Sequence, residues 1–176
     1  KNCNRLYSIK IPNVTSIGEN AFEGCGKLRC NTYGYADYLG NEQNPYVILI
    51  KGSSTGEINQ ATKFIHSGAF KDFVNLESVT IPNNVKSIDS YTFSGCSRLK
   101  SVSIPDGVTN IGDYAFSNCI SLTDITIPDN VTNIGENAFL GCDNLRCNEY
   151  GNAYYLGNEQ NPYVLLVKPI RKSIKS

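Results

Sequence analysis

The sequence has no excess of either charge and no long apolar run. Sixteen Lys and Arg residues balance sixteen Asp and Glu residues, so the electrostatic reason to expect binding to nucleic acid or to an anionic membrane surface is missing. No segment approaches the roughly 18 consecutive apolar residues of a membrane-spanning helix, and we expect no membrane insertion by this chain. A length of 176 residues with 40% hydrophobic side chains is enough for one well-buried core.

Residues and motifs that support catalysis are also scarce. The one histidine, His66, has no second histidine and no cysteine at the spacing of metal ligands, so we expect no metal site and no cofactor. The Gly-x-Ser-x-Gly motif and glycine-rich phosphate loops are absent. A Cys–His nucleophile would need a thiol brought beside His66 by the fold. We therefore predict that the protein is not an enzyme and that His66 is a surface residue at a bend.

What the sequence does contain is a 23-residue repeat. Its clearest copy starts at Leu99 and reads LKSVSIPDGVTNIGDYAFSNCISL, and the leucines at 76, 99, 122 and 145 advance by 23 residues each time. A fixed period of this length is the signature of a solenoid, in which each repeat buries its apolar face only against its neighbours. Because Lys1 falls inside a repeat and no signal peptide precedes it, we expect the sequence to be a piece of a longer array.

The repeats follow one another without a linker, so we expect a single domain, 1–176. A longer variant occurs twice, with an offset of 117 residues, and the two copies are more alike than neighbouring plain repeats are, which indicates duplication of a long unit. The predicted repeats are 6–28, 28–76 (a long variant with a hairpin at 33–52), 76–99, 99–122, 122–145 and 145–176 (an incomplete long variant).

Each plain repeat predicts the same local structure. Leu99–Ile104 alternates apolar and small polar residues, which is the period of one short strand with one buried face. Gly112 is predicted to allow a tight bend, and Asp113–Phe116 is predicted to form a single helical or 3₁₀ turn. The aromatic residue of each repeat should stack on the next; these are Phe22, Phe70, Phe93, Phe116 and Phe139.

Four cysteines occupy one position of the repeat: Cys25, Cys96, Cys119 and Cys142. Phe73 holds the same position in another repeat, so the site is a packing position, and the thiols are predicted to be buried and reduced. A disulfide between Cys25 and Cys30, or between Cys142 and Cys147, is the alternative reading.

The outward positions of the predicted strands form the first candidate binding surface. The polar residues there are Ser78, Thr80, Ser101, Ser103, Asp124 and Thr126. One reading is that outward strand residues must simply be polar. The other is a shallow surface for a protein or a glycan. Since aromatic and arginine anchors are missing from it, we expect weak binding strengthened by repetition.

The hairpin-like segments form the second candidate surface. Gly40–Pro45 lies between two apolar stretches, as in a β-hairpin. Tyrosine is common at recognition sites because its ring provides contact area and its hydroxyl provides direction. The candidates are Tyr35, Tyr38, Tyr154 and Tyr155. The alternative, that several of these rings fill the core at an irregular repeat, stays open.

The motif LxSVxIPxxVTxIGxxAFxxCxxL resembles the BspA-like leucine-rich repeat family over nearly the whole chain. The resemblance implies a right-handed, curved leucine-rich-repeat solenoid with one short strand per repeat, loops or short helical turns, and inserted hairpin-like segments. It also implies a secreted or cell-surface location. The expected function is a non-enzymatic adhesion module that binds an unidentified protein or glycan; the alternative is a structural spacer that displays other domains.

Overall fold

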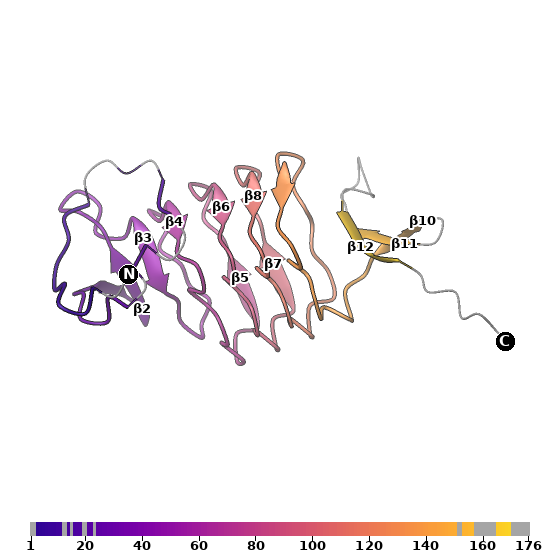
Figure 1. Ribbon diagram of the computed structural model, residues 1–176, viewed down its shortest axis with the longest axis horizontal. Coiled ribbons are helices and arrows are strands. Elements are labelled where there is room, and N and C mark those ends of the chain that lie inside the picture. Colours follow the sequence, from indigo (N-terminus) through magenta and orange to yellow (C-terminus); the bar gives the residue numbers. More distant parts are fainter. Residues whose placement is uncertain are drawn as a thin grey trace.

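The computed structural model describes residues 3–11, 14, 16–18, 21–22, 24–150, 153–156 and 165–169, with the backbone alone for 153–154 and 165–169. The described part consists of short strands, turns and bends, with no helix. Successive coils stack side by side along one axis, with a hairpin near each end of the row (Figure 1). The chain is a leucine-rich-repeat solenoid.

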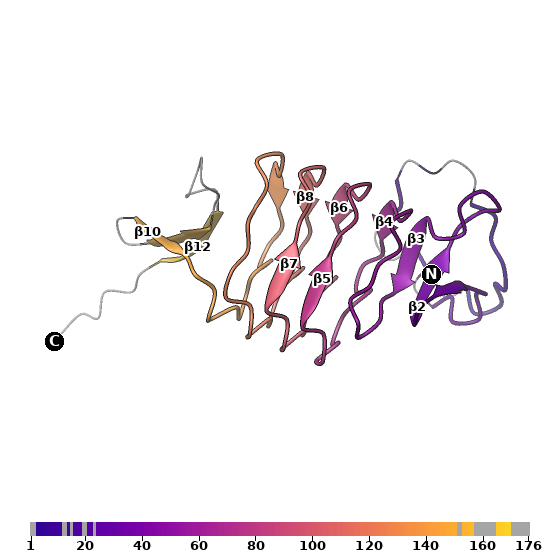
Figure 2. The ribbon, with the colours of Figure 1, turned by 180° about the vertical axis from the view of Figure 1, so that it is seen from behind.

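Neighbouring coils are joined by two separate parallel ladders. In the first, β5 (Ser78–Thr80) pairs with β7 (Ser101–Ser103), as the view from behind shows (Figure 2). In the second, β6 (Ser87–Ile88) pairs with β8 (Asn110–Ile111), and β8 pairs with β9 (Asn133–Ile134). Paired residues are 23 apart. The prediction of one strand per repeat was therefore wrong, because a two-residue strand is too short to show alternation in the sequence.

The first ladder is also shorter than predicted. Neither 8–10 nor 124–126 is a strand, although Ile125 is buried and its neighbours are exposed as the alternation requires. Both segments come immediately before a hairpin in the order of the stack. Arg29 N–H donates to the Tyr7 carbonyl and Arg146 N–H donates to the Thr123 carbonyl, and after each bond the following chain leaves the ladder to enter its hairpin.

The predicted helical turn at Asp113–Phe116 is instead a row of β-turns. Ser117 N–H donates to the Tyr114 carbonyl at 3.1 Å, and Cys119 N–H donates to the Phe116 carbonyl at 3.2 Å. The backbone is left-handed at Tyr114 (φ 55°) and again at Asn118 (φ 59°). A left-handed residue every four positions interrupts any right-handed helix, so only isolated turns form.

Gly112 is required by a close contact rather than by a bend. A Cβ at this position would lie 2.8 Å from the carbonyl carbon of Asp89 in the neighbouring coil. The Gly112 N–H donates to the Ile88 carbonyl at 2.7 Å. The glycine therefore lets two coils approach closely enough to bond.

The core of the plain repeats is a stack of phenylalanine rings. Phe70, Phe93, Phe116 and Phe139 lie in sequence, with ring centroids 5.1, 5.2 and 5.3 Å apart and nearly parallel planes. The prediction of this stack is confirmed for these four rings and is wrong for Phe22. The Phe22 ring instead lies 5.7 Å from the His66 ring, because the first hairpin separates the first repeat from the stack.

The first hairpin lies between two hydrophobic clusters and contributes side chains to both. It consists of β1 (Asn31–Tyr33), β2 (Ala36–Leu39) and β3 (Ile48–Lys51), and β3 pairs in parallel with β4 (Phe64–Ile65). Side chains from one face, including Tyr38, belong to the main core. Side chains from the other face, including Leu39 and Ile48, pack with Ile11 of the first repeat.

The second hairpin repeats this topology. It consists of β10 (Asn148–Tyr150), β11 (Ala153–Leu156) and β12 (Leu165–Pro169), all antiparallel. Leu156, the counterpart of Leu39, packs against the main core. Each hairpin thus covers the repeat that precedes it with the same face.

Candidate functional site

The strand face carries a shallow groove lined by hydroxyl groups. Ser78, Thr80, Ser101 and Ser103 point outward and are exposed, while Val79 and Val102 between them are buried. The groove has a volume of about 350 Å³. Its lining residues are Ser78, Val79, Thr80, Ser101, Val102, Ser103, Ile104 and Thr126. The structure therefore brings together five of the six predicted strand-face residues; Asp124 is exposed but does not line the groove.

The side-chain hydroxyls that line this groove differ from the other hydroxyls of the repeats. None of its serine and threonine side chains has a hydrogen-bond partner in the described part of the chain. Hydroxyls elsewhere in the repeats do: Ser94 and Ser117 bond each other at 2.8 Å, and Thr109 donates to the Lys86 carbonyl at 3.3 Å. The strand-face hydroxyls can therefore both donate to and accept from a ligand.

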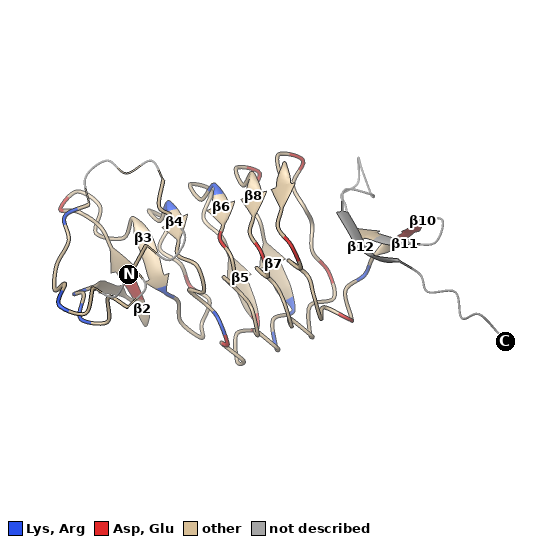
Figure 3. Ribbon diagram, in the orientation of Figure 1, with Lys and Arg blue, Asp and Glu red and all other residues tan. Residues whose placement is uncertain are grey.

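Charged side chains lie beside the groove and do not line it. Glu77, just before β5, accepts from Arg98 and from Lys100, both at 2.9 Å. The hydrogen bond and charge of Lys100, with the charge of Arg98, hold the pKa of Glu77 below its ordinary value. Along the whole solenoid the two signs are interspersed (Figure 3). The lining of the groove is thus polar and carries no charged side chain.

The tyrosines of the hairpins are not one surface. Tyr38 is fully buried: its ring meets the Tyr46 ring edge-on, and its hydroxyl accepts from the Asn59 N–H at 3.1 Å. Burial raises the pKa of Tyr38. The expectation of Tyr38 as a binding residue was wrong, because the alternation of β2 turns Ala36 and Tyr38 together toward the core.

The other three candidates divide differently. Tyr35 is 87% exposed, in the turn that follows Gly34. Tyr155, the counterpart of Tyr38, is half-buried. The side chain of Tyr154 lies outside the described residues. Tyr35 is therefore the one hairpin candidate that the structure places fully in solvent.

His66 is not the surface residue that the sequence predicted. It is half-buried beside Phe22, and its Nδ1 lies 2.8 Å from the Ser67 carbonyl, so Nδ1 carries the proton that is donated there. Its Nε2 is buried and has no hydrogen-bond partner among the residues that the structure describes. Across the described ranges no group of three His, Cys, Asp or Glu side chains is arranged to hold a metal ion.

The cysteines of the repeat form a ladder of thiols beside the phenylalanine stack. Cys96, Cys119 and Cys142 are buried, and each donates to the phenylalanine carbonyl of the preceding coil, at 3.0–3.2 Å. Cys25 is half-buried, and the structure holds no disulfide. Burial raises the pKa of Cys96 to about 12, and the neighbouring Cys142 thiol together with burial raises that of Cys119.

We expect this ladder to be inert toward thiol reagents. At pH 8 in the folded protein, exposed Cys3 should be alkylated within minutes, and Cys96 and Cys119 at least about 1,000-fold more slowly, because the reactive thiolate forms only when the coils open. Peptide mapping after timed alkylation measures both rates. All seven cysteines should react in 6 M guanidinium without reductant; similar rates for Cys3 and Cys96 in the folded state would contradict the prediction.

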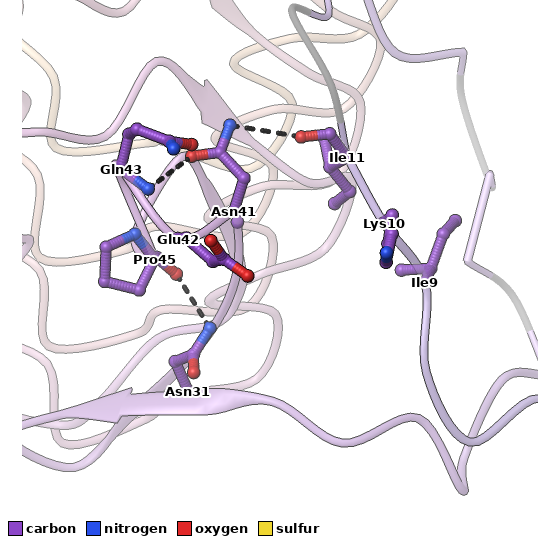
Figure 4. Close-up of a pocket in the computed structure, with 9 residues that line it drawn as sticks. Ile9, Lys10, Ile11, Asn31, Asn41, Glu42, Gln43 and Pro45 are labelled. Atoms are coloured by element: carbon purple, nitrogen blue, oxygen red, sulfur yellow. Dashed lines mark hydrogen bonds between the residues drawn. The ribbon is translucent and has the colours of Figure 1, made fainter.

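A second groove, near the first hairpin, was not predicted from the sequence. It has a volume of about 800 Å³ and lies between the first repeat and the loop after β2 (Figure 4). Its lining residues are Ile9, Lys10, Ile11, Asn31, Gly40, Asn41, Glu42, Gln43 and Pro45. One signal in the sequence marks it: Tyr38–Val47 recurs without change as Tyr155–Val164, although residues on both sides differ.

Stacked coils with a 23-residue offset, parallel ladders and an internal phenylalanine stack define the class as leucine-rich-repeat proteins. Within that class, the family model described as "BspA type Leucine rich repeat region" matches in six copies over residues 1–35 and 57–158, and the chain belongs to this family. The stretch between the two matched ranges, 36–56, contains β2 and β3 of the first hairpin.

Two solved structures of leucine-rich-repeat proteins are similar to this chain. The chain is 31% identical to a leucine-rich repeat protein from Bacteroides ovatus (TM-score 0.49), covering 83% of this chain and 34% of that one. It is 29% identical to a leucine rich cell surface protein from Faecalibacterium prausnitzii (TM-score 0.50), covering 96% of this chain and 41% of that one. It thus spans less than half the length of either. No curated protein matches. Among the described residues, no helix is long and apolar enough to cross a membrane.

Proposed function

We propose that the protein is a non-enzymatic binding module whose strand face holds an extended, uncharged polar ligand, a glycan or a polypeptide. The observation that carries the proposal is the hydroxyl-lined groove over β5 and β7. The side-chain hydroxyls of Ser78, Thr80, Ser101, Ser103 and Thr126 have no hydrogen-bond partner among the described residues. Groups that both donate and accept suit a ligand with the same mixed character, such as a sugar hydroxyl or a peptide bond.

The geometry supports weak contacts repeated along an axis. The groove is shallow and has no aromatic or arginine anchor, so each coil contributes little. Equivalent hydroxyls on neighbouring coils then bind one long ligand at high effective concentration. The likeness to a bacterial cell surface protein supports a cell-surface setting for such binding.

We expect the double variant Ser101→Ala/Ser103→Ala to weaken binding about 10-fold or more. Two ligand hydrogen bonds at about 1 kcal/mol each account for this loss. The measurement is titration of the ligands that wild-type protein retains on a glycan and peptide array. The matched control is Ser97→Ala/Ser121→Ala, which removes the hydroxyls of two serines outside the groove and should leave affinity unchanged.

The array also tests the alternative, a structural spacer. A spacer would retain no ligand above background. Equal binding by both double variants would instead show that a ligand binds elsewhere on the protein. Either result would remove the strand face as the binding surface.

A further inference from the structure

The extended segment Tyr7–Ile11 has an incompletely paired edge that faces the first hairpin. The Tyr7 carbonyl accepts from the Arg29 N–H at 3.0 Å, and the Ile11 carbonyl accepts from Asn41 Nδ2 at 3.1 Å. In an extended chain, the backbone groups of every second residue point to the same edge. Ile9 therefore directs its N–H and C=O toward the hairpin as well, and neither has a partner in the described part of the chain.

The Ile9 side chain is also left uncovered. It is 40% exposed, whereas its counterparts Val79, Val102 and Ile125 are buried, at 4%, 8% and 6%. The chain enters the hairpin after Arg29, and no strand lies beside Ile9 in the described part of the chain; Ile125, which also precedes a hairpin, is covered. The groove of about 800 Å³ occupies the place beside Ile9 (Figure 4). The groove offers what an added strand would need: an open backbone edge and an exposed apolar side chain.

The far wall of the groove is a preformed loop. Asn41 Oδ1 accepts from the N–H groups of Gln43 and Asn44, at 3.0 and 2.8 Å, and Asn44 Nδ2 donates to the Ala61 carbonyl. These bonds explain why asparagine recurs at positions 41 and 44 of the loop. Glu42 and the Gln43 side chain are exposed and bond nothing in the described structure, yet both recur in the second hairpin as Glu159 and Gln160. Their retention points to a contact with another molecule.

We propose that this groove binds an extended polypeptide segment of a partner protein, which adds a strand to the Tyr7–Ile11 edge and lies against Glu42 and Gln43. A peptide supplies N–H and C=O groups at the spacing of the Ile9 edge and an apolar side chain to cover Ile9. A glycan fits less well, since no aromatic ring lines the groove for a sugar to stack on. The site is separate from the strand-face groove and does not depend on the function proposed there.

The probe is the chain's own strand as a capped heptapeptide, Leu99–Pro105 (LKSVSIP), which pairs in parallel with β5 in the structure. At millimolar peptide, we expect the Ile9 amide signal to shift in NMR spectra and its hydrogen exchange to slow at least about 10-fold. Two further peptides carry N-methyl groups on alternate residues, one on Lys100, Val102 and Ile104 and the other on Ser101 and Ser103. One should lose binding and the other keep it, since only one edge of the peptide faces Ile9.

Variants separate this site from a general surface effect. Glu42→Ala/Gln43→Ala should weaken peptide binding several-fold without changing the fold, and Tyr35→Ser, outside the groove, should not. An unshifted Ile9 amide, or equal binding of both methylated peptides, would overturn the proposal. Protection of the Ile9 amide by self-association in the absence of peptide would also overturn it, because the edge would then bind a second copy of the chain. Glycan binding that is lost in Glu42→Ala/Gln43→Ala would overturn it as well.

Discussion

Phe116→Ala is expected to lower the free energy of unfolding by about 3–5 kcal/mol. The Phe116 ring is fully buried and is stacked on both sides, by Phe93 at 5.2 Å and by Phe139 at 5.3 Å. Truncation removes both stacking contacts and leaves a cavity between coils that are held at a fixed spacing by two ladders. Because domains are stable by only about 5–15 kcal/mol, a large part of the stability should be lost.

The measurement is urea denaturation, with the midpoint and the slope compared between variants. Phe22→Ala is the matched control: it alters the same position of the repeat, but the ring is half-buried and outside the stack. It should cost less than half as much. If the two variants lose equal stability, or if Phe116→Ala broadens the transition without shifting it, the stack is not what couples the coils.

The features that could be predicted are those in which a residue stacks on its own copy. A 23-residue offset places phenylalanine on phenylalanine and cysteine near cysteine, so the core follows from the period alone. The outward serines of β5 and β7 follow from alternation in the same way. The type of turn could not be predicted, because Tyr114 adopts a left-handed backbone that is rare for a bulky side chain. Contacts between coils, which the sequence does not show, hold this conformation.

The hairpins limit what the sequence can predict. Tyr38 and Tyr35 stand in one tyrosine-rich stretch, yet one is fully buried and the other is 87% exposed. Their difference depends on which face of β2 meets the main core, and this is set by packing with a distant repeat. The groove beside Ile9 lies where the chain leaves a ladder, and periodicity does not reveal such a departure.

Gly52→Ala is expected to cost about 3 kcal/mol, at the upper end of what overpacking of a core usually costs. Gly52 ends the first hairpin, directly after β3, and its N–H donates to the Ala69 carbonyl at 2.7 Å. A Cβ at this position would overlap three ring atoms of Phe70. That ring cannot move aside easily, because it is buried and stacked on Phe93 at 5.1 Å. The hairpin backbone thus takes the place of the next ring at this end of the stack.

A double-mutant cycle tests whether this contact is the cause. Phe70→Leu alone should be destabilising, but it shortens the side chain that meets the new methyl group. The double variant should therefore lose at least about 1 kcal/mol less than the sum of the two single losses. Gly26→Ala is the control, since among the described residues no atom outside its two chain neighbours lies within 4 Å of its added Cβ. It should change stability by less than about 0.5 kcal/mol. Additive losses at Gly52 and Phe70 would show that the hairpin and the stack are joined elsewhere.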